Sequence, residues 1–138
     1  TLIFENGSNL TLLKNPIIDE YGNEYRCSEW YYMAQRTTDL WAKKIIAFLS
    51  TWFGLAMRAR QLYDLEQDEE KRIEYMRNAI REKFDNNPEL KEELLATGDK
   101  KIIEYTYRWD VRFGINQNTW NGKNILWKLL MEYRDNNK

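Results

Sequence analysis

The chain has 138 residues and a formal net charge of −1, so it has the length for one hydrophobic core, and we expect residues 1–138 to form a single domain. The balanced charge excludes a general DNA-coating protein, and the 43 % share of apolar residues excludes a disordered chain. Because the chain has no histidine and one cysteine, it lacks the commonest general base, the commonest zinc ligand and any disulfide framework. Catalysis would therefore depend on carboxylates, lysines or tyrosines.

No apolar stretch reaches the ~18 residues that cross a bilayer, so we expect no membrane contact and a cytoplasmic protein. We expect no resident metal or cofactor, although a Mg²⁺ ion carried by a substrate phosphate is compatible with the composition. The oligomeric state does not follow from the sequence.

Short apolar runs separated by Gly7, Pro16 and Gly22 occupy the first 27 residues, a pattern typical of brief strands and turns. From Ser28 the spacing becomes helical, with Ser28 as a cap and Glu29 in the first turn, where the helix dipole favours a negative charge. We therefore predict a small N-terminal β element followed by a helix over residues 28–36.

Apolar residues at spacings of three and four predict further helices along the chain. They cover residues 40–49, 53–63, 71–84, 89–96 and 125–134. Asp39 is the expected cap of the first of these helices, and large apolar side chains then form a stripe of the kind that helices bury: Leu40, Trp41, Ile45, Phe48 and Leu49. A short strand over residues 102–105 and a turn-rich segment over 109–124 complete a predominantly α-helical α+β fold.

Glu29 and Arg36 form the first candidate pair for chemistry. They are seven residues apart, so on a helix they share one face, two turns and about 10 Å apart at the backbone. The two side chains could bind opposite ends of one ligand. Alternatively, Glu29 only satisfies the helix N-terminus and Arg36 is solvated.

Asp110 is the second candidate acid. It has aromatic residues on both sides, which would desolvate the carboxyl group and raise its pKa. Alternatively, Asp110 caps the loop that follows it.

Several helical arginines suggest phosphate binding, since a guanidinium group makes bidentate contacts with phosphate, and Arg60 is the best placed of them. They are Arg58, Arg60, Arg72, Arg77 and Arg81. The alternative is a solvated helix face. The glycines form neither the dinucleotide-binding pattern nor the P-loop pattern, so neither of those nucleotide sites is supported.

Several short blocks stand in a fixed order along the chain: Ser8-Asn9, Gly22, residues 28–36, Thr97-Gly98-Asp99, residues 110–114, residues 122–126 and residues 130–134. Together they span nearly the whole chain, and in this order they resemble the NADAR (YbiA-like) family. The resemblance implies a YbiA-like single domain and hydrolysis of an N-glycosidic bond in a ribosyl-phosphate or ADP-ribose conjugate, such as a riboflavin-pathway intermediate or ADP-ribosylated guanine.

On this resemblance, Glu29 and Asp110 are the catalytic acids. Glu29 would direct water at the anomeric carbon or stabilise an oxocarbenium-like centre, and Asp110 would assist proton movement. The remaining predicted site residues bind the ligand: Asn9, Arg36, Arg60, Phe113 and Asn124. The expected partner is a small nucleotide sugar or an ADP-ribosylated base of a nucleic acid.

The chain departs from the family pattern at four positions. Trp30, Arg36, Phe113 and Trp127 stand where the family has histidine, lysine, tryptophan and glycine. Because a guanidinium keeps its proton near neutral pH, Arg36 cannot act as the base or the Schiff-base amine that a lysine could be. The second hypothesis is therefore a module that binds ADP-ribose or a related nucleotide without cleaving it.

Overall fold

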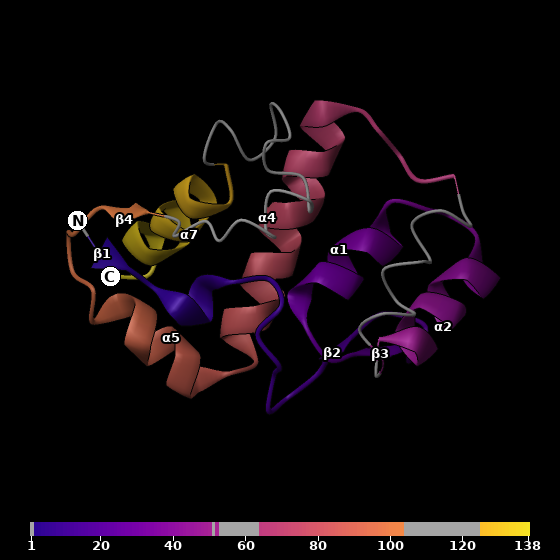
Figure 1. Cartoon of the computed structure of the whole chain (residues 1–138), viewed down its shortest axis with the longest axis horizontal. Helices are drawn as coiled ribbons and strands as arrows, with labels where there is room; N and C mark the ends of the chain where they lie inside the picture. The colour runs from indigo at the N-terminus through magenta and orange to yellow at the C-terminus, as the bar shows by residue number, and fades with distance from the viewer. Residues whose placement is uncertain (1, 51, 53–63, 104–124) are drawn as a thin grey trace. The chain divides into compact units, whose positions relative to one another are not determined.

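The computed structural model of the chain describes residues 2–50, 52, 64–103 and 125–138. These residues fall into two units, one made of residues 9–88 and the other of residues 1–8 with 89–138. Figure 1 labels their helices and strands, and each unit is described by itself.

The first unit begins with a small antiparallel hairpin. Strand β2 (Ile17–Ile18) pairs with β3 (Glu24–Tyr25), and Ile17 stands opposite Tyr25. The turn between them depends on Gly22, whose φ of +86° is a conformation that side chains with a Cβ rarely adopt. Asp19 accepts hydrogen bonds from the backbone N–H of Tyr21 and from the Tyr25 hydroxyl, at 2.9 and 2.8 Å. The predicted N-terminal β element is confirmed.

Helix α1 (Ser28–Gln35) follows the hairpin and ends one residue before the predicted boundary. The prediction that Ser28 caps this helix is wrong, because Cys27 occupies the N-cap position and makes no side-chain cap. The capping acceptor comes from Asn9 instead, whose backbone oxygen lies 3.0 Å from the Glu29 nitrogen. A residue distant in sequence thus satisfies one of the N–H groups that every helix start exposes.

Helix α2 (Leu40–Leu49) has the predicted bounds and the predicted cap. One Asp39 carboxylate oxygen accepts the backbone N–H groups of Trp41 and Ala42 at 2.9 and 3.2 Å. The predicted apolar stripe is only partly buried, because Ile45 and Leu49 are half-buried and its other three residues are exposed. The residues buried from α2 are Ala42 and Ile46, because the helix packs against α1 and β3 through this narrower face.

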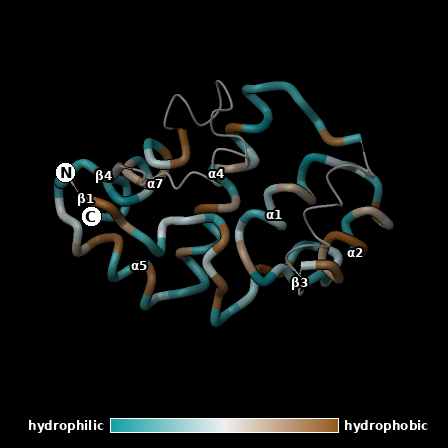
Figure 2. Tube along the Cα trace, viewed as in Figure 1, coloured by the Kyte–Doolittle hydropathy of each residue, from teal (hydrophilic) through white to brown (hydrophobic). Residues whose placement is uncertain are grey.

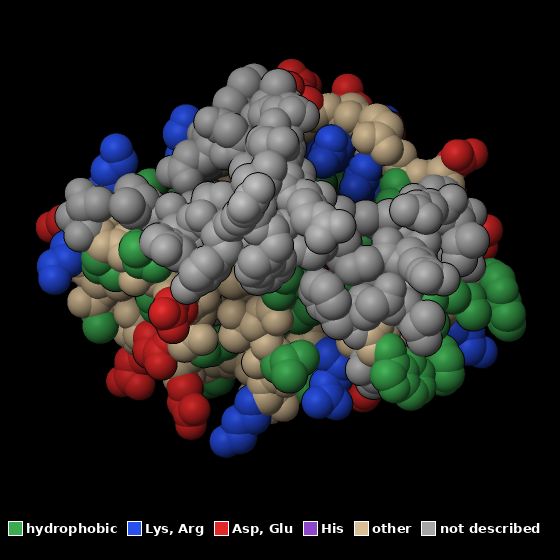
Figure 3. Space-filling model, viewed as in Figure 1, with side chains coloured by type: hydrophobic (Ala, Val, Ile, Leu, Met, Phe, Trp, Pro, Cys, Tyr) green, Lys and Arg blue, Asp and Glu red, His purple; other side chains and the backbone are tan. Residues whose placement is uncertain are grey.

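Large apolar side chains of α2 therefore lie at the surface. Leu40, Trp41 and Phe48 are 54 %, 64 % and 63 % exposed. Figure 3 shows hydrophobic side chains gathered over this helix.

Helix α4 (Glu69–Asp85) begins two residues before the predicted boundary. The Asp68 side chain accepts the Lys71 backbone N–H at 3.0 Å, which sets the start of the helix. Its buried face holds the predicted apolar residues Met76, Ala79, Ile80 and Phe84. In Figure 2, hydrophobic positions alternate with hydrophilic stretches along α4, as expected for a helix with one buried face. Helix α1 packs against both α4 and α2 (Figure 1).

The second unit contains the chain's two ends. Strand β1 (Leu2–Ile3) pairs in parallel with β4 (Ile102–Ile103), and a short 3-10 helix (Glu5–Gly7) follows β1. Helix α5 (Pro88–Leu95) leads into this unit, has Pro88 at its first position, and begins and ends one residue before the predicted range of 89–96. Helix α7 (Ile125–Asn136) contacts β4.

Arg134 of α7 is buried and connects α7 to Thr97 and Lys100 within the second unit. One of its Nη atoms donates to the Thr97 hydroxyl at 3.0 Å and to the Lys100 carbonyl at 2.6 Å. The described helices and the two small strand pairs confirm a mostly helical fold with a small β component. The predicted helix over 53–63, the end of the predicted strand at 104–105 and the turn-rich segment 109–124 lie outside the described residues.

Candidate functional site

Glu29 lies at the second position of α1 and is half-buried. Its backbone is held by the Asn9 carbonyl, and its carboxylate lies 3.5 Å from the Asn9 side-chain nitrogen, a long contact for a hydrogen bond. The structure thus brings together two of the predicted site residues, Glu29 and Asn9.

Asn9 is itself held from several sides. The Ser28 hydroxyl donates to the Asn9 side-chain oxygen at 3.0 Å, and the Asn9 side-chain nitrogen lies 3.1 Å from the sulfur of Met76 in α4. Because Asn9 is only 9 % exposed, its contacts within the protein suit a residue that positions Glu29. Direct contact of Asn9 with a ligand stays a prediction.

Arg36 is the residue directly after α1 and is buried, with 8 % of its surface exposed. Its Nε donates to the backbone oxygen of Glu66 at 2.8 Å, and its own backbone oxygen accepts the Glu66 N–H at 2.8 Å. Its guanidinium carbon also lies 5.5 Å from the centre of the Tyr32 ring, a cation–π distance. The alternative that Arg36 is a solvated surface residue is therefore wrong.

Tyr32 lies between Glu29 and Arg36 on the same face of α1. It is three residues after Glu29 and four before Arg36, which places all three on one side of the helix. Its hydroxyl accepts a hydrogen bond of 2.9 Å from Nε of Arg72 in α4. Burial raises the pKa of the Tyr32 phenol, the charges of Arg36 and Arg72 oppose that rise, and the charge of Glu29 adds to it.

The sequence analysis did not single out Tyr32, and it named Arg72 only as one of the helical arginines that could bind phosphate. The helical spacing from Glu29 through Tyr32 to Arg36 is a signal that could have found Tyr32. The contact between Arg72 and Tyr32 carries no such signal, because it joins residues 40 positions apart.

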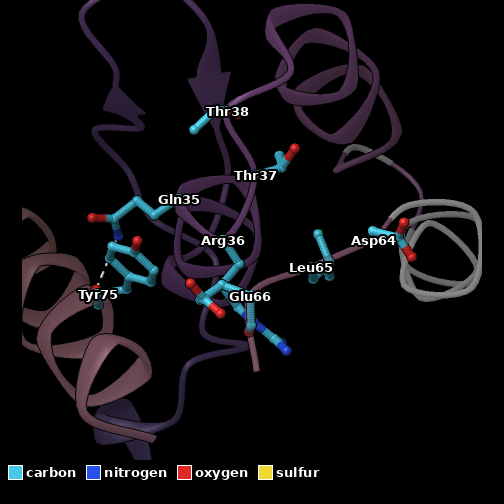
Figure 4. A pocket seen from close by; sticks show the side chains of 8 residues that line it. All are labelled: Gln35, Arg36, Thr37, Thr38, Asp64, Leu65, Glu66 and Tyr75. Atoms are coloured by element: carbon cyan, nitrogen blue, oxygen red, sulfur yellow. Dashed lines mark hydrogen bonds between the residues drawn. The ribbon is translucent and has the colours of Figure 1, made fainter. Parts of the chain in front are cut away.

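An open cleft of about 350 Å³ lies beside the C-terminal end of α1. Figure 4 shows the residues that line it: Gln35, Arg36, Thr37, Thr38, Asp64, Leu65, Glu66 and Tyr75. The Gln35 amide donates to the Tyr75 backbone oxygen at 2.9 Å, the bond drawn in Figure 4. The hydroxyls and carboxylates of this lining can bind a ligand that carries several hydroxyl groups.

The amine of Lys83 and the thiol of Cys27 are both buried, and Cys27 is the residue directly before α1. Burial raises the pKa of the Cys27 thiol to about 12 and lowers the pKa of the Lys83 ammonium to about 7. Cys27 acts on Lys83 in the direction opposite to burial. Lys83 is only 1 % exposed, so it carries a large desolvation cost whenever it is protonated.

The other predicted site residues lie outside the described residues: Arg60, Asp110, Phe113 and Asn124. Their roles stay predictions. Within the described parts of the chain, no group of three or more cysteine, aspartate and glutamate side chains is arranged to hold a metal ion. Among the helices that the structure describes, none combines the length and the apolar character that spanning a membrane requires.

Comparison with known proteins identifies the class to which this fold and site belong. The NADAR domain family matches residues 4–136, and the chain belongs to that family.

The relatives and a solved structure agree with this assignment. The chain is 34 % identical over 116 residues to N-glycosidase YbiA of Shigella flexneri, covering 83 % of this chain and 71 % of that protein. It is 33 % identical to Riboflavin biosynthesis protein VVA0006 of Vibrio vulnificus, covering 83 % of this chain and 31 % of that longer protein. The NMR structure of the E. coli protein YbiA matches with a TM-score of 0.74 at 32 % identity, covering 95 % of this chain and 76 % of that chain.

Proposed function

We propose that this chain is an N-glycosidase that hydrolyses the bond between a ribose carbon and a base nitrogen in a phosphate-bearing conjugate. The observation that carries the proposal is the placement of Glu29, half-buried beside Asn9 on the same helix face as Tyr32 and Arg36. The names of the relatives, N-glycosidase and riboflavin biosynthesis protein, support this choice of reaction and of substrate class.

In the proposed reaction, water adds to the anomeric carbon as the bond from that carbon to the base nitrogen breaks. The Glu29 carboxylate accepts a proton from the water or stabilises the positive charge that develops on the sugar. The leaving nitrogen must gain a proton, and we assign that proton movement to Asp110. The products are a free base and a reducing sugar phosphate.

Asn9 and Arg36 have supporting roles in this proposal. Asn9 holds the start of α1, so that the Glu29 carboxylate has a defined direction. Arg36 provides a permanent positive charge for the phosphate or for a ribose hydroxyl, since it cannot supply a lysine's amine chemistry. Arg60, Phe113 and Asn124 complete the predicted ligand-binding set.

We propose ADP-ribosylated guanine or a ribosylaminopyrimidine phosphate as the substrate, and the cytoplasm as the place of action. Both substrates are charged, and charged phosphates do not enter the apolar interior of a bilayer readily. Such molecules therefore stay in the compartment where they form.

A second candidate function is binding of ADP-ribose without cleavage. The observation that favours it is Arg36, which replaces the lysine of the family pattern and is already bonded to the Glu66 backbone. A binding module needs the positive charge of Arg36 but no base or nucleophile at this position.

The two functions can be separated by incubating the protein with ADP-ribosylated guanine nucleotide and with a ribosylaminopyrimidine 5′-phosphate, followed by chromatography of the released base. Release by the wild type that disappears in Glu29→Gln supports hydrolysis. The matched control is Glu70→Gln, an exposed carboxylate on α4, which should release base at the wild-type rate. Saturable binding of ADP-ribose in calorimetry without release from either conjugate would leave only the binding function.

A further inference from the structure

The side-chain amide of Asn9 has protein neighbours at both ends. The Ser28 hydroxyl donates to Oδ1 at 3.0 Å, while Nδ2 lies 3.1 Å from the Met76 sulfur and 3.5 Å from Oε2 of Glu29. All four residues belong to one unit of the chain, where Ser28 and Glu29 begin α1 and Met76 lies on α4. Ser28 and Met76 are each 1 % exposed, so their contacts with the amide are shielded from water.

The chemistry of these neighbours selects one orientation of the Asn9 amide. An amide nitrogen donates and an amide oxygen accepts, whereas an ionised carboxylate and a thioether only accept. With Nδ2 toward Glu29 and Met76, the nitrogen faces two acceptors and Oδ1 faces a hydroxyl that donates to it. The opposite orientation would place Oδ1 against two acceptors, which is costly for a buried group.

The contacts of the Ser28 hydroxyl are not those of a helix cap. The N-cap position is held by Cys27, and the Ser28 hydroxyl lies 3.0 Å from Oδ1 of Asn9 and 3.3 Å from its backbone oxygen. A hydroxyl donates one hydrogen, so the shorter contact is the one that fixes the amide. The Asn9 backbone oxygen accepts the Glu29 N–H at 3.0 Å. One residue thus holds the backbone of Glu29 and also faces its carboxylate.

We propose that Ser28 is a positioning residue for Glu29 and acts through the Asn9 amide. By holding Oδ1, the Ser28 hydroxyl keeps Nδ2 directed at Oε2 of the Glu29 carboxylate. Ser28 itself makes no contact with substrate in this role. The inference rests on the proposed function, because it takes Glu29 as the catalytic carboxylate.

A directed carboxylate matters for the proposed reaction. Reacting groups must be held within a fraction of an ångström of the productive geometry, and neighbouring hydrogen bonds supply that restraint. Several rotatable bonds separate the Glu29 carboxylate from its backbone, so a donor fixed beside Oε2 limits the directions that it can take. Catalytic hydrogen bonds often shorten when the substrate binds, so a contact of 3.5 Å is compatible with this role.

The test compares kcat and KM for base release, with the phosphorylated conjugate that the wild type cleaves. Ser28→Ala should lower kcat roughly 2- to 10-fold, the factor that one hydrogen bond is worth, with KM near the wild-type value. Ser28→Thr keeps the hydroxyl and should restore kcat. Asn9→Asp keeps the size of the side chain but replaces the Nδ2 donor with an oxygen that repels the carboxylate. It should lower kcat more than Ser28→Ala does.

Ser50→Ala is the matched control. Ser50 is a buried serine at the C-cap of α2, and its hydroxyl donates to the Ala47 backbone oxygen at 2.6 Å. The variant removes a serine hydrogen bond in a buried place and should leave kcat unchanged. If Ser28→Ala keeps the wild-type kcat while Glu29→Gln loses it, the inference is refuted and the N-glycosidase proposal stands. Equal losses of kcat in Ser28→Ala and a folded Ser28→Thr would also refute the role of the hydroxyl.

An NMR measurement separates failure of this inference from failure of the proposed function. The side-chain N–H signals of Asn9 are those that disappear in Asn9→Asp. Their order parameters should lie near the ~0.85 of rigid groups in the wild type and in Ser50→Ala, and fall toward ~0.6 in Ser28→Ala. If the wild type releases no base but shows this fall, the ordering role of Ser28 stands and the N-glycosidase proposal falls. An Asn9 amide that stays equally ordered in Ser28→Ala refutes the inference whatever the turnover.

Discussion

Replacing Lys83 with methionine should stabilise the protein, and the gain should depend on pH. Lys83 is 1 % exposed in α4, and burial lowers the pKa of its ammonium to about 7 from an ordinary value of 10.5. Methionine has a similar length and no charge, so Lys83→Met removes the titration while it keeps most of the packing volume.

The direction of this pH dependence follows from the number of protons that the folded and the unfolded chain bind at Lys83. Between about pH 7 and pH 10.5 the unfolded chain holds a proton on Lys83 that the folded chain has lost, so stability rises with pH across this window. Below the window the full cost of the buried charge is present, and above it the cost vanishes. Since one pKa unit is worth about 1.4 kcal/mol, the cost falls by roughly 2–3 kcal/mol between about pH 6 and about pH 9.

The assay is urea unfolding of the wild type and Lys83→Met at about pH 6 and about pH 9. The difference in the free energy of unfolding between the two proteins should be larger at the lower pH by roughly 2–3 kcal/mol. Lys128→Met is the control, because Lys128 is an exposed lysine on a helix and its removal should change stability equally at both pH values. A difference between the wild type and Lys83→Met that stays constant with pH would refute the reasoning.

Three further substitutions test the packing around the site and beyond it. Gly7→Ala should cost about 1–3 kcal/mol in urea unfolding, because a Cβ at Gly7 would lie 2.7 Å from the Trp127 ring; an unchanged midpoint would contradict this. Asn9→Ala should cost about 1–3 kcal/mol in the same assay, since it removes a buried hydrogen-bond partner of Ser28, and a neutral effect would show that the partner is dispensable. Arg36→Lys should lower the midpoint of thermal unfolding, because a lysine ammonium cannot place an Nε on the Glu66 backbone; equal midpoints would contradict that role.

Local signals in the sequence predicted much of the fold. Helix α2 has the predicted start because Asp39 caps it, and α5 begins at Pro88, one residue before the predicted start. Both residues act on their neighbours, and such contacts can be read from adjacent positions. Helix α4 follows from apolar residues at spacings of three and four, and Met76 and Phe84 of that pattern are buried.

The features that escaped prediction all involve residues far apart in sequence or a choice between two helix faces. Asn9 satisfies the N–H of Glu29 across 20 positions, so the local sequence pointed to Ser28 instead. In α2 the bulky apolar stripe predicted the helix, but the buried residues of the helix, which packs against α1 and β3, are Ala42 and Ile46.

The candidate site was predicted only in part for the same reason. The shared helix face of Glu29 and Arg36 follows from their spacing of seven residues. Arg36 is held by a hydrogen bond to the Glu66 backbone, 30 positions away. The Tyr32 hydroxyl is held by a hydrogen bond from Arg72, 40 positions away. Neither contact leaves a periodic signal in the sequence.

The most direct test of the central claim is kcat for base release by Glu29→Gln, measured with the phosphorylated conjugate that the wild type cleaves. Glutamine keeps the size of the side chain and its contact with Asn9 but cannot accept a proton or carry the negative charge. If Glu29 is the catalytic carboxylate, kcat should fall by roughly 10²–10⁴-fold while the unfolding midpoint stays near that of the wild type. A folded Glu29→Gln protein that releases base at the wild-type rate would contradict the account.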